Sequence, residues 1–254
     1  MANKFAIVTG ASTGIGFHLA KLAVADGYDV LAAADTPFDQ DLGGSVETLQ
    51  VDLSTTDGVD QLLARAGGRQ VDLLCANAGH GLGHAFLDQD VADWRHVVDT
   101  NITGTLYLLH KALPAMVARN DGKVLVTGSV AGYIPGSFQA VYNSSKSFVD
   151  MFMEALRNEL KESDGITLTT LMPGPVETEF FDRGGLGDTS VGQDPNKSDP
   201  ADVAQDGWDA VMGGKASIFS GWKTKLQGVI ANVTPNAMLA EQHRKMAEPG
   251  SGDQ

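Results

Sequence analysis

The chain has few cysteines, no long apolar runs and few basic residues, which are features that disulfide-bonded, membrane-spanning and nucleic-acid-binding proteins depend on. Cys75 is the only cysteine, so no intrachain disulfide can form, and a reducing compartment suits the chain. No apolar run approaches the length of a membrane span, and we expect none. Lysine and arginine number 18 against 32 aspartate and glutamate residues, and the net charge of -14 argues against binding to nucleic acid or to an anionic membrane surface.

The first residues bear on where the protein works. Met1 to Ile7 already leads into an apolar strand, which leaves no room for a signal peptide. We therefore expect a cytoplasmic protein, in which Cys75 is a small buried hydrophobic residue.

What the chain does have is a regular alternation of short apolar runs and helical patterns. This alternation is typical of βαβ units, in which helices cover both faces of a parallel sheet. The 254 residues and the hydrophobic content of 43% suit one α/β domain, expected over residues 1–247. We predict a doubly wound, mostly parallel sheet of seven strands, near residues 5–8, 30–33, 49–51, 71–76, 124–127, 166–171 and, as a candidate, 217–219.

Helical patterns connect these strands. They cover residues 14–26, 91–117 and 142–160. Asp199-Pro200 is typical of an N-cap followed by the first helical position, and it predicts a helix that ends near Met212.

Three segments depart from this regularity. Residues 34–45 contain proline and two glycines, so we expect a short or irregular helix there. A segment rich in glycine, proline and aspartate predicts a lid over a binding site around residues 175–199. Residues 248–254 are expected to form a disordered tail.

A glycine loop follows the first apolar strand. In Thr9-Gly10-Ala11-Ser12-Thr13-Gly14-Ile15-Gly16, the glycines at 10, 14 and 16 lie between that strand and an amphipathic helix. Glycine lets the backbone approach a phosphate closely, and amides at the start of the helix carry partial positive charge toward it. The pattern predicts a dinucleotide site, although a tight strand-to-helix turn would show the same glycines.

A tyrosine and a lysine lie four residues apart on the helix that begins near residue 142. Tyr142 and Lys146 would share one face of that helix, and Ser129 stands thirteen residues before the tyrosine. An amphipathic face, a turn at Ser129 and a cap or kink at Asn101 would explain each residue alone. Together they fall where a doubly wound sheet has its crevice, and this favours a catalytic site.

These motifs resemble those of the short-chain dehydrogenase/reductase family, in its short single-domain form, over nearly the whole chain. The glycine loop, Asn77-Ala78-Gly79 and the segment from Pro173 to Thr178 are similar to the family's cofactor-binding segments. Asp52 resembles its adenine-contacting aspartate, with a solvated strand-end carboxylate as the alternative. The resemblance implies a Rossmann fold and a nicotinamide cofactor bound by Gly10, Ser12, Thr13, Gly14, Ile15, Gly16, Asp35, Asp52, Leu53, Asn77, Ala78, Gly79, Tyr142, Lys146, Pro173, Gly174, Val176 and Thr178.

The resemblance also implies four catalytic residues, Asn101, Ser129, Tyr142 and Lys146. Tyr142 would be the general acid in ketone reduction and the base in alcohol oxidation, and Ser129 would hold the substrate oxygen. Lys146 would bind the nicotinamide ribose, and Asn101 would hold a water that links the lysine to solvent. A tyrosine alone titrates near about 10, so we expect Lys146 and an oxidised nicotinamide to lower the pKa of Tyr142.

Asp35, after the second strand, bears on the choice between NAD and NADP. A carboxylate there can bond the ribose hydroxyls of NAD and repel the extra phosphate of NADP. Counted from Gly27, the family's usual acidic position falls on Ala34, so Asp35 is displaced by one residue. No lysine or arginine lies within residues 12–13 or 34–36, and we therefore predict NAD, with NADP less favoured.

The segments expected around the substrate are mostly apolar. They comprise residues 80–86, residues 130–138 and the lid, with Tyr133 and Arg183 as polar contacts. We predict an oxidoreductase that acts on a small hydrophobic ketone or secondary alcohol. The alternatives left open are a silent dinucleotide-binding sensor or scaffold, and chemistry without hydride transfer, such as dehalogenation.

Two further expectations concern metals and assembly. His80 and His84 are four residues apart, but the glycines between them argue against a helix, and no metal site is predicted. The resemblance implies a homodimer or homotetramer that pairs the two long helices. Core packing is the alternative role for the residues that would make this contact, which are Ala115, Met116, Phe148, Met151 and Phe152.

Overall fold

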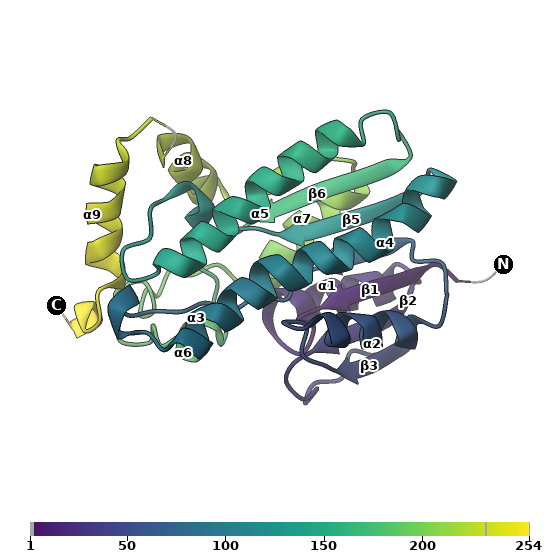
Figure 1. Cartoon of the computed structure of the whole chain (residues 1–254), viewed down its shortest axis with the longest axis horizontal. Helices are drawn as coiled ribbons and strands as arrows, with labels where there is room; N and C mark the ends of the chain where they lie inside the picture. The colour runs from purple at the N-terminus through teal and green to yellow at the C-terminus, as the bar shows by residue number, and fades with distance from the viewer. Residues whose placement is uncertain (1–2, 232, 254) are drawn as a thin grey trace.

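Seven parallel strands form one sheet in the computed structural model, which describes residues 3–231 and 233–253 (Figure 1). The strands are β1 Phe5–Thr9, β2 Asp29–Ala34, β3 Val46–Gln50, β4 Leu73–Ala76, β5 Gly122–Thr127, β6 Ile166–Met172 and β7 Ser217–Phe219. Their order is β3-β2-β1-β4-β5-β6-β7, so the winding reverses between β1 and β4. The predicted doubly wound Rossmann fold with seven strands is confirmed, and every strand pair is parallel.

Both faces of the sheet are buried by helices. Along β1 the side chains alternate, so Phe5 and Ile7 join the apolar core on one face, whereas Ala6 and Val8 join the core on the other. This burial on two faces explains why the strands read as continuous apolar runs. Helices α2 Thr56–Ala66, α4 Thr105–Arg119 and α5 Ala140–Glu159 cover the first face, and α1 Gly14–Ala25 and α7 Pro200–Met212 cover the second.

The helix predicted over residues 91–117 is divided into three parts. α3 Val91–Val98 leads into a π-helical turn, Asp99–Gly104, before α4 begins. Within the turn the Asn101 amide bonds to the carbonyl of His80, and a Cβ at Gly104 would overlap the backbone of Leu53. π-helical turns often mark functional positions, and this one carries a predicted catalytic residue.

The irregular segments differ from expectation in detail. Residues 35–45 contain no helix, where a short or irregular one was expected. The lid contains one short helix, α6 Phe180–Arg183, and a parallel bridge between Val176 and Ser198. The predicted cap is confirmed, because the Asp199 side chain accepts a hydrogen bond of 2.7 Å from the amide of Ala201.

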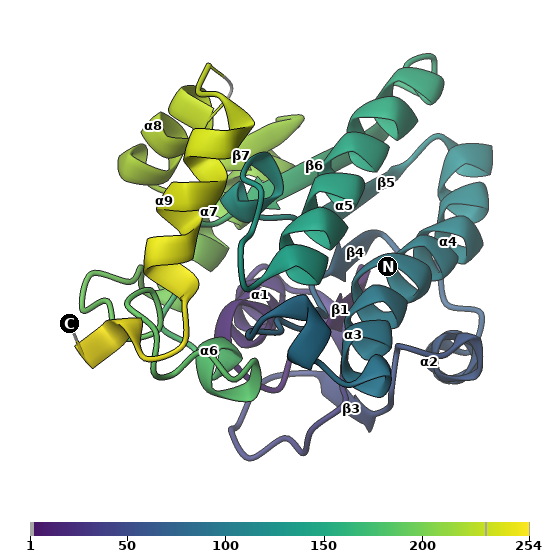
Figure 2. The same ribbon diagram turned by 60° about the vertical axis from the view of Figure 1, so that its left-hand side comes forward.

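Two helices that the sequence patterns did not predict follow β7. They are α8 Trp222–Ala231 and α9 Asn236–Ala247, which lie side by side in Figures 1 and 2. In the described ranges, no helix is long and apolar enough to cross a membrane.

The end of the chain is bound to the lid, where a disordered tail was expected. Ser251–Asp253 forms a 3-10 turn, and the Ser190 hydroxyl donates to the carbonyl of Ser251 over 2.7 Å. The Gly252 amide donates to the carbonyl of Asp188 over 3.0 Å. These bonds supply the partners that a free tail would lack. Residues 1, 2 and 232 of the predicted domain and the last residue of the predicted tail lie outside the described residues.

Candidate active site

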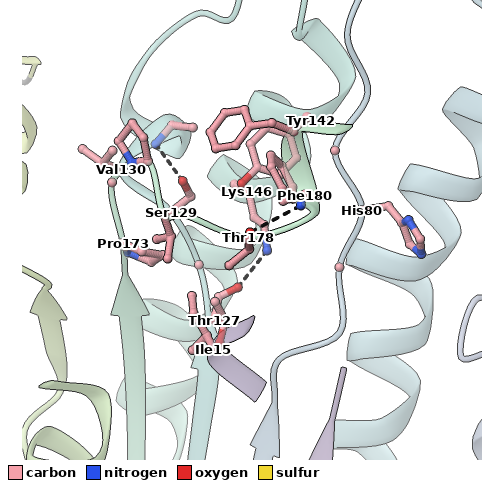
Figure 3. Close-up of a pocket in the computed structure, with 18 of the residues that line it drawn as sticks. Ile15, His80, Thr127, Ser129, Val130, Tyr142, Lys146, Pro173, Thr178 and Phe180 are labelled. Atoms are coloured by element: carbon pink, nitrogen blue, oxygen red, sulfur yellow. Dashed lines mark hydrogen bonds between the residues drawn. The ribbon is translucent and has the colours of Figure 1, made fainter. Parts of the chain in front are cut away.

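A cavity of about 500 Å³ lies at the carboxyl ends of the central strands (Figure 3). Doubly wound sheets place their ligands at this edge, beside the point where the strand order reverses. The sequence-predicted residues that line the cavity are Gly10, Ser12, Thr13, Gly14, Ile15, Asp35, Asp52, Leu53, Asn77, Ala78, Gly79, Ser129, Tyr142, Lys146, Pro173, Gly174, Val176 and Thr178. Gly16 and Asn101 are the two predicted site residues that do not line it.

The glycine loop adopts a backbone that requires glycine. Gly10 and Gly14 have φ of 62° and 58°, in the left-handed region. A Cβ at Gly10 would lie 2.9 Å from Cα of Ala78, and one at Gly16 would overlap the Gly10 carbonyl. Gly16 therefore serves the close packing of α1 on β1, whereas Gly10 and Gly14 open the start of α1 toward the cavity. This is a cradle that suits a pyrophosphate.

Asn77 joins the ends of three neighbouring strands. Its Nδ2 donates to the Gly10 carbonyl over 3.3 Å, and its Oδ1 accepts from Oγ1 of Thr127 over 2.9 Å. Oγ1 of Thr9 accepts from the amides of Asn77 and Ala78, each over 3.0 Å. Thr9 and Thr127 were not predicted as site residues, and their signal was a threonine at the end of each of two apolar strands.

Tyr142 and Lys146 lie on one face of α5 and point into the cavity, as predicted (Figure 3). Nζ of Lys146 donates to the Thr127 carbonyl over 2.8 Å. The Tyr142 ring packs against the ring of Phe180 from the lid, with centroids 5.0 Å apart. Ser129 follows β5 and lines the same cavity. A phenol, an amine and a hydroxyl thus surround one space.

Burial shifts the pKa values of both α5 residues. It raises the pKa of Tyr142 to about 12, against a smaller lowering by the hydrogen bond to Ser129. It lowers the pKa of Lys146 to about 8, because an ammonium group is poorly solvated there. Burial is thus the largest effect of the protein on the pKa of Tyr142, and the expected lowering by Lys146 together with an oxidised nicotinamide stays a prediction.

Asp150 is a buried carboxylate that was not predicted to matter. It lies one turn after Lys146 on α5, and neither of its oxygens accepts a well-formed hydrogen bond from the described part of the chain. Burial raises its pKa to about 7, while Lys146 and the backbone of Ser129 lower it by less. Tyr142, Lys146 and Asp150 follow a spacing of four, which is the signal that could have found it.

We predict that Asp150→Asn makes the protein more stable at pH 8. The folded-state pKa is raised to about 7. Between about pH 4 and 7 the folded state therefore holds a proton that the unfolded state lacks, and the free energy of unfolding falls as pH rises. At pH 8 the free energy of unfolding of the variant is expected to exceed that of wild type by up to about 4 kcal/mol, and this difference should vanish toward pH 4.

Thermal melts of wild type and variant from pH 4.5 to 8.5 would measure this difference. Glu159→Gln, which changes an exposed carboxylate on the same helix, is the matched control. A change in Tm that is the same at every pH would show that Asp150 is not the titrating group.

Asn101 acts on the loop after β4 rather than on the cavity. Its Oδ1 accepts from the His80 amide over 2.8 Å, and its Nδ2 donates to the His80 carbonyl over 3.0 Å. A Cβ at Gly79 would lie 3.2 Å from Oδ1 of Asn101 and 3.4 Å from Nζ of Lys146. The π-helical turn thus fixes the segment beside the lysine. Its expected role in holding a water stays a prediction.

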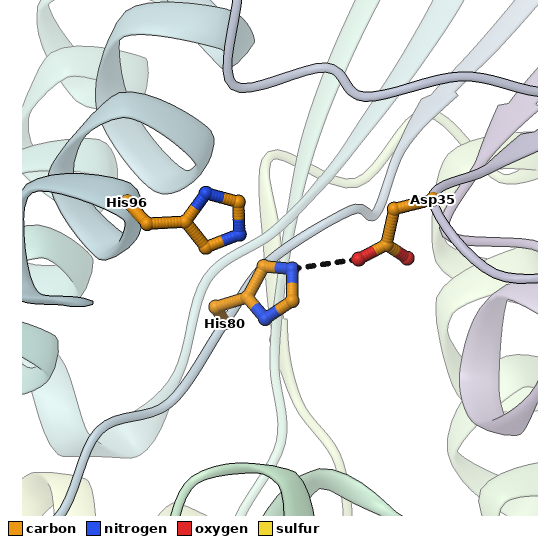
Figure 4. A group of neighbouring side chains, drawn as sticks. All are labelled: Asp35, His80 and His96. Atoms are coloured by element: carbon orange, nitrogen blue, oxygen red, sulfur yellow. Dashed lines mark hydrogen bonds and ion pairs between the residues drawn. The ribbon is translucent and has the colours of Figure 1, made fainter. Parts of the chain in front are cut away.

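Asp35 contacts two basic side chains from distant segments (Figure 4). Its Oδ2 lies 3.0 Å from Nε2 of His80 and accepts from Nη2 of Arg183 over 2.7 Å. These contacts hold the pKa of Asp35 well below its usual range, and the hydrogen bond with His80 has the largest effect. No arginine was found near Asp35 in the sequence because Arg183 comes from α6, 148 residues later.

His80 also belongs to a group that could hold a metal ion. The ligating atoms of Asp35, His80 and His96 lie within 4.8 Å of one another (Figure 4). The second histidine of this group is His96 on α3, whereas the sequence spacing had drawn attention to His84. A cluster of a carboxylate and two histidines was not predicted. The Arg183 guanidinium bonds to the same Asp35 oxygen and opposes a second cation there. The absence of a metal site stays a prediction.

The pocket walls agree in part with those expected. His80, Gly81, Val130, Ala131, Ile134, Phe180, Phe181 and Arg183 line the cavity. Tyr133 does not, because its hydroxyl contacts Sδ of Met172 over 3.4 Å instead. The residues of α8 and α9 that line the cavity were missed altogether, and they are Lys223, Leu226, Gln227, Ile230, Ala231, Leu239, Gln242, His243 and Met246.

Comparison with known proteins identifies the family. A model of short chain dehydrogenases matches residues 4–185. An NADP-dependent 3-hydroxy acid dehydrogenase of Salmonella typhi is 34% identical over 183 residues, which are 68% of this chain and 73% of that protein.

Two solved structures have the same fold. A short-chain dehydrogenase from Sphingobium yanoikuyae in complex with NADPH has a TM-score of 0.78 at 22% identity, over 91% of this chain and 96% of that one. A short chain dehydrogenase/reductase from Burkholderia phymatum in complex with NAD also has a TM-score of 0.78 at 22% identity, over 89% and 92% of the two chains. At this identity the two structures bear on the fold alone. Because the family model matches more than half of this chain, the chain belongs to the short-chain dehydrogenase family.

Proposed function

We propose that this oxidoreductase interconverts a secondary alcohol and a ketone by hydride transfer to and from a nicotinamide cofactor. The observation that carries the proposal is that Ser129, Tyr142 and Lys146 line the same cavity as the glycine loop. A proton donor and a cofactor cradle are both needed for carbonyl reduction, because a hydride and a proton must reach the same carbonyl group.

The residues present suit a dinucleotide. The amides at the start of α1, opened by Gly10 and Gly14, would bind the pyrophosphate. Lys146 would bind the nicotinamide ribose, and Thr178 would hold the nicotinamide carboxamide. When bound, the nicotinamide supplies or accepts the hydride.

Tyr142 is the group proposed to move the proton. With a pKa raised to about 12, its hydroxyl carries the proton that ketone reduction consumes, and transfer would become efficient when the bound cofactor brings that pKa closer to neutral. In alcohol oxidation the positive charges of Lys146 and of an oxidised nicotinamide would favour the phenolate. Ser129 would hold the substrate oxygen beside the tyrosine, an effect of orientation.

NAD is the proposed cofactor, with NADP less favoured. His80 and Arg183 both contact Oδ2 of Asp35, so Oδ1 can accept a hydrogen bond from a ribose hydroxyl. The carboxylate would also repel a 2′-phosphate. Relatives in the family do not decide the matter, since the Salmonella enzyme is NADP-dependent and the Burkholderia protein binds NAD.

Absorbance at the reduced-nicotinamide band tests the proposal. NADH and NADPH would be offered with hydrophobic ketones, and NAD and NADP with the matching alcohols. Turnover of ketones would support the reaction and identify the cofactor. Cofactor binding without turnover of any ketone, alcohol or carrier-bound thioester would instead favour a dinucleotide-binding sensor. Turnover of thioesters alone would contradict the proposed substrate class.

We also propose a cytoplasmic homodimer or homotetramer in which α4 and α5 pair between subunits. Phe148 and Met151 on α5 are 45% and 65% exposed, which suits such a contact. Met116 was expected on this surface, but it is fully buried in the core, so that part of the expectation is wrong.

Met151→Lys is expected to weaken self-association by about tenfold or more, because it places charge in the centre of an apolar contact. Sedimentation velocity over a range of concentrations would measure it. Leu87→Lys, which changes a residue that is 91% exposed outside α4 and α5, is the control. Equal effects of the two changes would exclude the α5 surface.

A further inference from the structure

α8 and α9 each present one helical face to the active-site cavity. The lining residues of α8 are Lys223, Leu226, Gln227, Ile230 and Ala231, and those of α9 are Leu239, Gln242, His243 and Met246. Both sets follow the three- and four-residue spacing of one side of a helix. We call the part of the cavity between these two faces the α8–α9 trough.

The trough leaves apolar surface accessible. Leu226 and Ile230 line it although they are 51% and 49% exposed, and Met246 is 38% exposed. Val229 on α8 is 54% exposed but does not line the cavity, because it lies off the facing side of the helix. When an apolar ligand covers apolar side chains that are accessible inside a cavity, the burial of this surface favours binding.

Hydrogen bonds fix α9 relative to the catalytic residues. Ser137 lies in the chain between Ser129 and Tyr142, and its hydroxyl donates to the carbonyl of Ala240 over 2.9 Å. Nδ1 of His243 lies 2.9 Å from the Ser137 carbonyl. The trough is therefore attached to the segment that carries the proposed serine and tyrosine.

α8 is seated against the turn that follows β6. Thr224 is buried, and a Cβ at Gly174 would lie 2.8 Å from its Oγ1. Gly174 itself lines the cavity on the cofactor side. The trough thus continues the cavity away from the proposed cofactor site, rather than forming a separate pocket.

The polar groups of the trough do not suit a polyanionic ligand. Lys223 is the one lysine or arginine among its lining residues on α8 and α9. Burial lowers the pKa of His243, which favours its neutral form. With a net charge of -14, the protein as a whole repels polyanions.

We infer that the α8–α9 trough binds the extended apolar tail of the substrate, so that the enzyme prefers ketones and secondary alcohols with longer alkyl chains. The inference rests on the proposed function and narrows its substrate class. The family model ends at residue 185, before α8 begins, so this preference belongs to the part of the chain that the model does not cover.

A series of 2-alkanones from butan-2-one to decan-2-one tests this. In wild type, kcat/KM is expected to rise about three- to fourfold for each added methylene, from the free energy of burying one methylene group. Ile230→Asn and Leu226→Asn should flatten this rise and lower kcat/KM for decan-2-one about tenfold, with butan-2-one changed less than about twofold. Val229→Asn, the same change of polarity at the position of α8 just before Ile230, should leave the rise intact.

Equal slopes for Ile230→Asn and Val229→Asn, or no slope in wild type, would overturn the inference. Calorimetric binding of decan-2-one to wild type, Ile230→Asn and Val229→Asn provides a reading that needs no turnover. Weaker binding by Ile230→Asn than by Val229→Asn would support the trough even if no ketone were reduced, and the lack of reduction would then count against the proposed function alone. Equal binding by the two variants would overturn the inference independently of catalysis.

Discussion

Tyr142→Phe is expected to lower kcat for carbonyl reduction about a thousandfold while the affinity for NADH changes less than about threefold. Proton transfer by a positioned side chain contributes about 10²- to 10⁴-fold to a rate. The change removes only the hydroxyl and keeps the ring, whose centroid lies 5.0 Å from that of Phe180. The packing against the lid is therefore expected to remain. The loss should appear in kcat more than in KM, since the donated proton matters in the transition state.

Tyr133→Phe is the matched control. It removes a hydroxyl that contacts Sδ of Met172 and does not line the cavity. Both tyrosines have pKa values raised by burial, so a high pKa does not distinguish them. Steady-state kinetics would be measured alongside a fluorescence titration of NADH. A kcat of Tyr142→Phe close to that of wild type would refute the proton-transfer role, whereas a similar loss in both variants would indicate a general disturbance of packing.

Much of the fold could be predicted because its signals are local. The central strands are buried on two faces, so their apolar runs stand out along the sequence, and the glycine loop needs left-handed backbone at Gly10 and Gly14. Tyr142 and Lys146 share a helix face by spacing alone. These features need only neighbours within one or two turns of the chain.

The parts that were missed depend on contacts between distant segments. Arg183 reaches Asp35 from 148 residues away, and no pattern near either residue indicates that pair. The π-helical turn around Asn101 follows from its bonds to the loop after β4, and a periodic pattern over residues 91–117 does not report it. The raised pKa of Tyr142 depends on burial, which only the packed structure gives.

α8 and α9 show the same limit for the substrate site. Their facing residues follow helical spacing, so the helices themselves could have been predicted from the sequence. The spacing does not show that both helical faces line one cavity. That arrangement depends on the hydrogen bonds with Ser137 and on the close approach of Thr224 to Gly174. The proposed catalytic residues were thus more predictable than the residues that would select the substrate.

Asp35→Arg is expected to shift the ratio of kcat/KM values for NADP over NAD upward by about 100-fold. The change removes the carboxylate that would accept from the ribose and repel a 2′-phosphate, and it places a third basic group beside His80 and Arg183. A hydrogen bond to a charged group contributes about 1.5–3 kcal/mol, and about 3 kcal/mol corresponds to roughly 100-fold in affinity.

Arg183→Gln separates the two effects of this cluster. Arg183 donates to Oδ2 of Asp35 over 2.7 Å and partly neutralises it, so its loss should leave a more strongly repelling carboxylate and lower the use of NADP, with NAD affected less. The two variants are therefore expected to move the cofactor ratio in opposite directions. Initial rates with both cofactors over a range of salt concentrations would measure this, since the repulsion weakens as ionic strength rises. If both variants kept the wild-type ratio, cofactor choice would lie elsewhere in the cavity, and the hydrogen bond between Arg183 and Asp35 would serve only to hold α6 of the lid against the end of β2.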